Sequence, residues 1–208
     1  MKSRYSLVLA ATLAVLSTLP ATAAPRTFDF KDPKGVNHAR FKLDAPLESI
    51  SGTANGVSGT LVIDEADPTA TKGTITIDAK SLHVENPVMK EHMHGKDWLG
   101  SAEHGEITFT VGSLKDFKKS GNVAEATVEG KFTLKGVTKP VSVPAKVTLL
   151  PGKLADRTNG KMKGDLIVVR STFTIKRSDY GINPGAPVDK VSDEIEISLA
   201  LAGASPEA

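Results

Sequence analysis

The chain has 208 residues, no cysteine, 26 basic residues and 24 acidic ones. The first 23 residues hold two of the basic residues and no acidic one, so the remainder carries 24 of each. A neutral chain without a basic cluster gives no support to nucleic acid as a partner, and without cysteine an exported fold has to be held by its core.

Residues 1–23 are predicted to be a secretory signal. They begin with two basic residues, continue with an apolar run over residues 7–16 and end in small residues at Ala23. This order is typical of an export signal, and the apolar run is shorter than the roughly 20 residues that a membrane-spanning helix needs. We therefore expect export to the periplasm, or secretion from a cell without an outer membrane, and one domain over residues 24–208.

From residue 57 onward, apolar and polar residues alternate with the period of a strand that has one buried face. Turn segments rich in glycine, proline and asparagine separate the alternating runs. The runs are residues 56–64, 73–80, 106–112, 122–136, 141–150, 167–177 and 191–202. Weaker patterns before residue 57 fit two or three more strands. Roughly eight to ten antiparallel strands of this kind form a two-sheet sandwich or a closed barrel.

Small residues on the apolar face favour a barrel with a hollow lumen. Ala124, Ala126 and Gly130 share that face in the longest run. An eight-stranded barrel can be filled by its own side chains or can hold one small ligand. The alternative is that these small residues let opposite walls approach each other. Pro144 falls on the polar face of its run, which predicts an edge or bulged strand.

The segment 86–99, NPVMKEHMHGKDWL, does not follow the alternating pattern. Asn86 followed by Pro87 is typical of the start of a helix, and Gly95 is typical of its end. We therefore expect a short helix over residues 87–94 that caps one mouth of the barrel.

Methionine side chains give this helix an adaptable apolar face. Met89 and Met93 are four residues apart and share that face. Trp98 and Leu99 continue it after the break. The alternative is an ordinary packed connection without ligand contact.

Histidines in and near the segment raise the alternative of a metal site. On a helix His92 and His94 point about 200° apart, so they cannot hold one ion together. On a strand they would share one face. The spacing of the other three histidines, His38, His83 and His104, matches no metalloenzyme signature.

Several segments together resemble the YceI-like family: GVSGTLVID, DWLGSAEHGEITF, VEGKFTLKGVTKPVSVP, IKRSDYGIN and VSDEIEISLAL. The resemblance spans residues 56–201, and its most specific parts are residues 130–140 and 177–182. It implies an extended, lipocalin-like antiparallel β-barrel that is exported to the periplasm. It also implies that the lumen holds a polyisoprenoid or a similar long amphiphile.

The expected fold is therefore all-β, an extended antiparallel barrel of about eight strands with a short helical cap. The residues expected to form the wall and the lid of the lumen are Met89, Met93, Trp98, Leu99, Phe109, Val128, Phe132 and Ile175. Alternation also places Arg177 and Asp179 toward the interior side near a strand end, where a charge is costly without a partner. Either an ion pair at the mouth of the barrel or a hydrogen bond to a ligand head group, such as a quinone carbonyl, would give the charge of Arg177 a partner. The head-group candidates are His92, Arg177 and Tyr180.

Catalytic signatures such as a nucleophile elbow, a phosphate-binding loop or a zinc-protease motif are absent from the sequence. We expect a periplasmic carrier of a polyisoprenoid or isoprenoid quinone, which is not an enzyme and has no cofactor or metal apart from the bound lipid. The sequence does not decide whether two copies of the chain form a homodimer. The alternative functions are a ligand-free barrel or sandwich that serves as an interaction module, and a periplasmic metal-binding protein.

Overall fold

Ten antiparallel strands form one sheet in the computed structural model, which describes residues 24–32 and 34–207. The strands are β1 (Arg26–Asp29), β2 (His38–Asp44), β3 (Ser49–Ala54), β4 (Val57–Ile63), β5 (Lys72–Asp78), β6 (Glu106–Ser120), β7 (Val123–Leu134), β8 (Val137–Leu150), β9 (Gly164–Lys176) and β10 (Glu194–Pro206). The helical elements are η1 (Pro68–Ala70), η2 (Ala79–Ser81), α1 (Pro87–His94), α2 (Leu154–Arg157) and η3 (Ser178–Tyr180). No helix of the described ranges is long and apolar enough to cross a membrane. The expected export signal, residues 1–23, lies outside the described residues.

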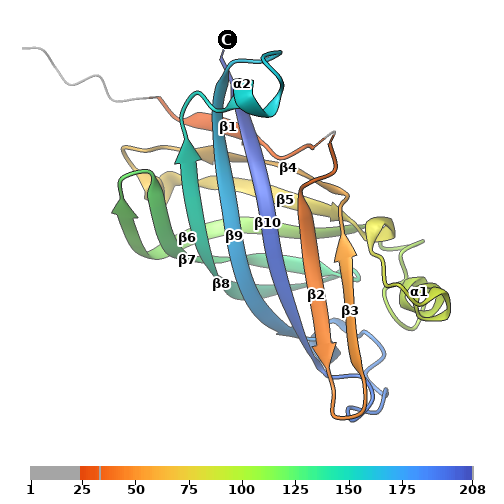
Figure 1. The fold of residues 1–208 in the computed structure, drawn as a ribbon. Coiled ribbons are helices and arrows are strands. Elements are labelled where there is room, and N and C mark those ends of the chain that lie inside the picture. The colour runs from red at the N-terminus through yellow and green to blue at the C-terminus, as the bar shows by residue number, and fades with distance from the viewer. Residues whose placement is uncertain (1–23, 33, 208) are drawn as a thin grey trace, which may run out of the picture.

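Eight of these ten strands close into a barrel, which confirms the barrel over the sandwich. The order is β1-β4-β5-β6-β7-β8-β9-β10, and β10 pairs back to β1. Strands β2 and β3 extend the sheet beyond β10 (Figure 1). Strand β10 therefore has two partners on one side: its residues 196–200 pair with β2, and Ala204 pairs with Asp29 of β1.

Asn37 holds the point at which β10 changes partner. Its buried side chain donates to the carbonyl oxygens of Phe30 and Ala202 at 3.0 and 2.9 Å, and it accepts from the N–H of Ala202 at 2.8 Å. A buried backbone group without a partner costs about 1–3 kcal/mol, and a side-chain amide supplies both a donor and an acceptor. Asn37 thus replaces the strand partner that Ala202 lacks between β2 and β1.

Strand β8 has a free edge over its first half. It pairs with β7 from Val137 to Thr148, but with β9 only from Ala145 onward. Pro144 is the residue directly before the β9 pairing begins. Because proline has no N–H to donate, this position confirms the edge that the sequence predicted for Pro144.

The two ends of the barrel differ (Figure 1). One end carries α1, the loop from α1 to β6, η3 and the loop at residues 181–193, and it is called the α1 end here. The opposite end carries α2 and the turn between β6 and β7, and it is called the α2 end.

Asp32 anchors the loop between β1 and β2 at the α2 end. Its carboxylate accepts hydrogen bonds from the N–H groups of Lys34, Val36 and Asn37 and lies 3.3 Å from Arg157 of α2. Burial raises the pKa of Asp32, but the three N–H donors and Arg157 outweigh burial, and the pKa lies below its ordinary value. A carboxyl with a lowered folded pKa stabilises the fold above its ordinary pKa, and this stabilisation is lost as the pH falls through the folded pKa.

We expect Asp32→Asn to lower the free energy of unfolding by roughly 2 kcal/mol at neutral pH, because hydrogen bonds to a charged acceptor are lost. The difference from wild type should shrink as the pH falls through the folded pKa of Asp32, which lies below its ordinary value. Urea unfolding across this pH range measures both effects. Glu106→Gln, a change at an exposed carboxylate, is the control. A difference that does not vary with pH would show that the charge of Asp32 does not matter.

Candidate functional site

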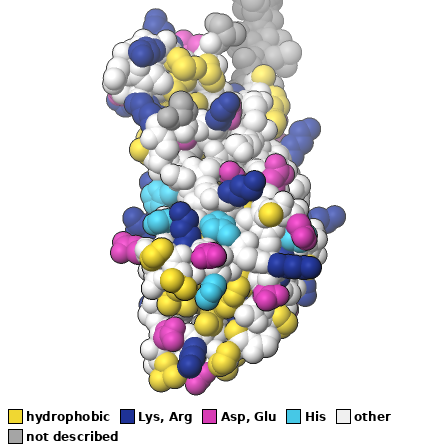
Figure 2. Space-filling view, turned by 90° about the vertical axis from the view of Figure 1, so that its right-hand side faces the viewer, with side chains coloured by type: hydrophobic (Ala, Val, Ile, Leu, Met, Phe, Trp, Pro, Cys, Tyr) yellow, Lys and Arg dark blue, Asp and Glu magenta, His cyan; other side chains and the backbone are white. Residues whose placement is uncertain are grey.

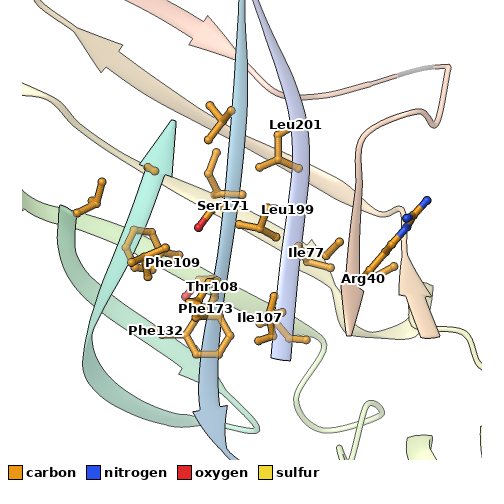
Figure 3. Close-up of a pocket in the computed structure, with 18 of the residues that line it drawn as sticks. Arg40, Ile77, Ile107, Thr108, Phe109, Phe132, Ser171, Phe173, Leu199 and Leu201 are labelled. Atoms are coloured by element: carbon orange, nitrogen blue, oxygen red, sulfur yellow. The ribbon is translucent and has the colours of Figure 1, made fainter. Parts of the chain in front are cut away.

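A cavity of about 470 Å³ occupies the lumen of the barrel. All ten strands contribute to its wall, and most lining side chains are aliphatic or aromatic. Figure 3 shows Phe109, Phe132 and Phe173 close together, with Leu199 and Leu201 of β10 above them. Cavities of about 300–1,000 Å³ with apolar walls are typical of small-molecule sites.

All eight residues that the sequence assigns to the wall and the lid line this cavity: Met89, Met93, Trp98, Leu99, Phe109, Val128, Phe132 and Ile175. Strands β6, β7 and β9 supply the wall residues of this set, and α1 and the loop after it supply the rest. The barrel thus brings together residues that are up to 86 positions apart in the sequence. Their contact with a ligand stays a prediction.

The small residues of β7 have two different roles. Ala124 and Ala126 line the cavity, and Ala145 of β8 lies directly across from Ala126 and also lines it. At Gly130, a Cβ would lie 2.5 Å from the Cζ atom of Phe109, so glycine makes room for that ring. The alanines leave volume in the lumen, whereas Gly130 permits close packing.

Helix α1 forms where the sequence predicts it, over residues 87–94. Asn86 Oδ1 accepts hydrogen bonds from the N–H groups of Val88 at 3.0 Å and Met89 at 3.1 Å, which satisfies the first turn. Gly95 ends the helix. The capped helix is therefore a local consequence of its own sequence.

The helix and the residues after it cover part of the α1 end of the cavity. Met93 and Trp98 are half-buried and Leu99 is buried, while Met89 remains exposed. All four line the cavity. Because Met89 lines the cavity and is also exposed, the lid reaches from the lumen to solvent.

The side chains of His92 and His94 on α1 lie in different environments, as expected for a helix. His94 is half-buried, with Nδ1 2.7 Å from the hydroxyl of Ser101 and Nε2 3.0 Å from the carbonyl of Leu82. His92 is exposed and lines the cavity at the mouth. In the ranges 24–32 and 34–207, no group of three or more metal-ligating side chains is placed to hold an ion. His94 thus fastens α1 to its neighbouring segments.

Arg177 is buried at the α1 end of the cavity wall. Its Nη1 donates to the carbonyl oxygens of Ile182, at 2.7 Å, and Asn183, and its Nε donates to Ser192 at 3.3 Å. Its guanidinium carbon lies 5.9 Å from the centre of the Trp98 ring, a cation–π distance. Within the described part of the chain, these donors meet backbone carbonyls rather than the carboxylate of an ion pair.

The neighbours of Arg177 in the IKRSDYGIN segment are placed differently. Asp179 is exposed and pairs with Lys139 on the surface at 3.4 Å. The interior position predicted for Asp179 is wrong, because β9 ends at Lys176 and Asp179 lies in η3, where the alternation of a strand no longer applies. Tyr180 is buried behind the wall, with its ring edge-on to Phe132 at 5.7 Å. Burial, and secondarily the Asp179 carboxylate, raises the pKa of Tyr180 above its ordinary value, so its hydroxyl stays neutral at physiological pH.

A charged rim at the α2 end escaped the sequence analysis. Arg26 forms ion pairs with Glu65 and Asp165, and Glu65 also lies 3.3 Å from Lys119. Arg26, Glu65 and Lys119 line the cavity. The four residues lie on β1, β9, β6 and the loop after β4, so their meeting depends on closure of the barrel. No local pattern distinguishes them from ordinary solvated strand ends.

Phe173 is a wall residue for which the sequence held a usable signal. It lies on the same face of β9 as Ile175, two residues away. Its ring packs edge-on against Phe132 at 6.0 Å and lines the cavity. Extending the alternation by one step would have included it.

Comparison with known proteins gives the same family as the sequence motifs. A family model described as a YceI-like domain matches residues 28–202. The chain is 32% identical to Protein YceI of Escherichia coli O157:H7 over 178 residues, which covers 84% of this chain and 86% of that protein. It is 31% identical to Protein YceI of Salmonella newport over 190 residues, with coverages of 90% and 92%.

Solved structures share the fold at low sequence identity. BcnA of Burkholderia cenocepacia matches with a TM-score of 0.63 and 22% identity over 80% of this chain and 95% of that chain. A polyisoprenoid-binding domain from Saccharophagus degradans, implicated in plant cell wall breakdown, matches with a TM-score of 0.62 and 14% identity over 88% and 100%. These likenesses establish the extended barrel architecture.

Proposed function

Because this chain belongs to the YceI-like family, we propose that it is a carrier that holds a polyisoprenoid, or a related long-chain amphiphile such as an isoprenoid quinone, in the barrel lumen. The observation that carries the proposal is the cavity of about 470 Å³ with its largely apolar wall. The likeness in fold to a polyisoprenoid-binding domain supports the class of ligand.

Burial of the isoprenoid chain supplies the affinity in this proposal. At ~0.8 kcal/mol per methylene equivalent, three isoprene units removed from water contribute on the order of 10 kcal/mol before the costs of ordering. Phe109, Val128, Phe132 and Ile175 contact the chain, and the lid segment covers it. No covalent step is required, so we propose a binding protein and not an enzyme.

The head group is placed at the α1 end in this proposal. His92 is exposed at the mouth, so its ring nitrogens can exchange water for a head-group oxygen at little cost. Arg177 already gives hydrogen bonds to three carbonyls, which favours a supporting role beneath the lid. Tyr180 does not line the cavity and packs behind Phe132, so in this proposal it supports the wall rather than contacting the head group.

The proposed location is the periplasm, because residues 1–23 resemble an export signal. A carrier there would shield an isoprenoid chain from water between membranes. This role needs no nucleic acid, metal or other cofactor.

Mass spectrometry of an organic extract tests the proposal. The protein is purified from the periplasm without detergent, and we expect an isoprenoid lipid in a near-stoichiometric amount. An extract without lipid, repeated after incubation with polyprenyl lipids, would reject the carrier and favour a ligand-free interaction module. Zinc or copper that survives dialysis and is lost on His92→Ala would instead favour a metal-binding protein.

A further inference from the structure

Exposed apolar side chains gather at the α1 end. Leu47 in the turn between β2 and β3 is 65% exposed, Val188 in the loop at 181–193 is 64% exposed, and Val88 and Met89 at the start of α1 are 59% and 38% exposed. Figure 2, which views the right-hand side of Figure 1, shows hydrophobic side chains gathered over the lower half of this face. Leu47, Val88, Met89 and Val188 are called the apolar rim here.

The apolar rim frames the mouth of the cavity. Leu47 and Val188 belong to segments that touch, because the N–H of Leu47 donates to the carbonyl of Asp189 at 2.9 Å. Glu48 of the same turn lines the cavity, as does Met89 on α1. Figure 1 places this turn and α1 at the end of the barrel away from α2, and Met89 belongs to both the rim and the lumen.

Charges on the rim segments favour a neutral lipid surface. From residue 85 to 97, in the turn between β2 and β3 and in the loop at 181–193, the basic residues are Lys90, Lys96 and Lys190, and the acidic ones are Glu48, Glu85, Glu91, Asp97, Asp189 and Asp193. A surface with at least as many acidic as basic residues has no electrostatic attraction to anionic lipids. The cavity mouth at the α2 end, by contrast, is crossed by the ion pairs of Arg26 and Glu65.

From these observations we propose that the apolar rim docks on the surface of a zwitterionic bilayer. Val88, Leu47 and Val188 insert among the head groups, and the ligand passes between the bilayer and the lumen along Met89. Three short segments around an opening fit a fluid lipid surface, since each can insert independently. The inference rests on the proposed function, because only a lipid ligand makes this contact useful.

Flotation with phosphatidylcholine vesicles tests the docking surface. We expect Leu47→Asp and Val188→Asp each to weaken the apparent affinity for vesicles about tenfold, because a carboxylate replaces an apolar group at the contact. Neither residue lines the cavity, so the lipid content of the purified variants and their thermal unfolding should equal those of wild type. Wild-type binding should be insensitive to salt between about 0.1 and 0.5 M.

Two exposed apolar residues near the α2 end provide matched controls. Val36→Asp and Met162→Asp make the same chemical change at the opposite end, and we expect both to leave vesicle binding unchanged. Equal binding by all four variants, or none by lipid-loaded wild type, would overturn the docking surface and leave the carrier function intact. Loss of a wild-type dimer in the rim variants without loss of vesicle binding would assign the rim to self-association instead. An extract without lipid would overturn the carrier function itself.

Discussion

Ala145→Phe is expected to expel the bound lipid and leave the barrel folded. Ala145 of β8 lines the cavity and lies across from Ala126 and Ser171, two small residues that leave room for a ring. The added phenyl ring displaces on the order of four methylenes of ligand, about 3 kcal/mol of burial, which weakens binding by roughly a hundredfold. Mass spectrometry of the extract measures the lipid that remains.

Ser142→Phe is the matched control for this prediction. Ser142 lies on the same strand, is exposed, and faces away from the lumen. It receives the same large side chain without narrowing the cavity, so its lipid content should equal that of wild type. Circular dichroism and thermal unfolding show whether each variant keeps the fold. Full lipid content in a folded Ala145→Phe protein would place the ligand outside the lumen.

The second large effect is expected at Arg177. Arg177→Ala leaves the carbonyls of Ile182, Asn183 and Ser192 without their donor and removes the partner of the Trp98 ring. Unsatisfied buried groups cost about 1–3 kcal/mol each. We therefore expect the free energy of unfolding to fall by roughly 3–5 kcal/mol, measured by urea unfolding.

Lipid content in the same variant separates two roles of Arg177. If Arg177 supports the loop at 181–193, stability falls while a folded sample at low temperature still retains lipid. Loss of lipid without loss of stability would assign Arg177 to the head group. Arg170→Ala is the control, because Arg170 lies on β9, the strand that ends directly before Arg177, with its side chain exposed. Exposed positions of this kind change stability by about 0.5 kcal/mol or less.

Local signals predicted most of the elements but not all of their bounds. Strand β6 continues to Ser120, beyond the alternating run 106–112, because two register shifts interrupt its alternation, and α2 was not predicted. Alternation predicted the strands from residue 57 onward because successive side chains of a strand point to opposite faces. Asn86, Pro87 and Gly95 predicted α1 because a helix is capped by residues adjacent to it in the chain. The same alternation selected four residues that line the cavity, Phe109, Val128, Phe132 and Ile175, since an inward-facing residue of a barrel faces the lumen.

Local patterns could not predict the role of a residue whose partner lies far away in the chain. Gly130 has its role because the ring of Phe109 lies against it, and this depends on how β6 and β7 are paired. Asn37 replaces a missing strand at Ala202, 165 positions later in the chain. Neither partner can be identified from the residues next to Gly130 or Asn37.

The sequence by itself determined the strand pattern, the short capped helix and the inward face of most strands, because each depends on neighbouring residues. Tertiary structure decided between sandwich and barrel through the pairing of β10 with β1, and it decided which carbonyls Arg177 meets. It also decided the volume of the lumen. A cavity is the space left when all surrounding side chains are in place, so its volume is set once every wall has been positioned.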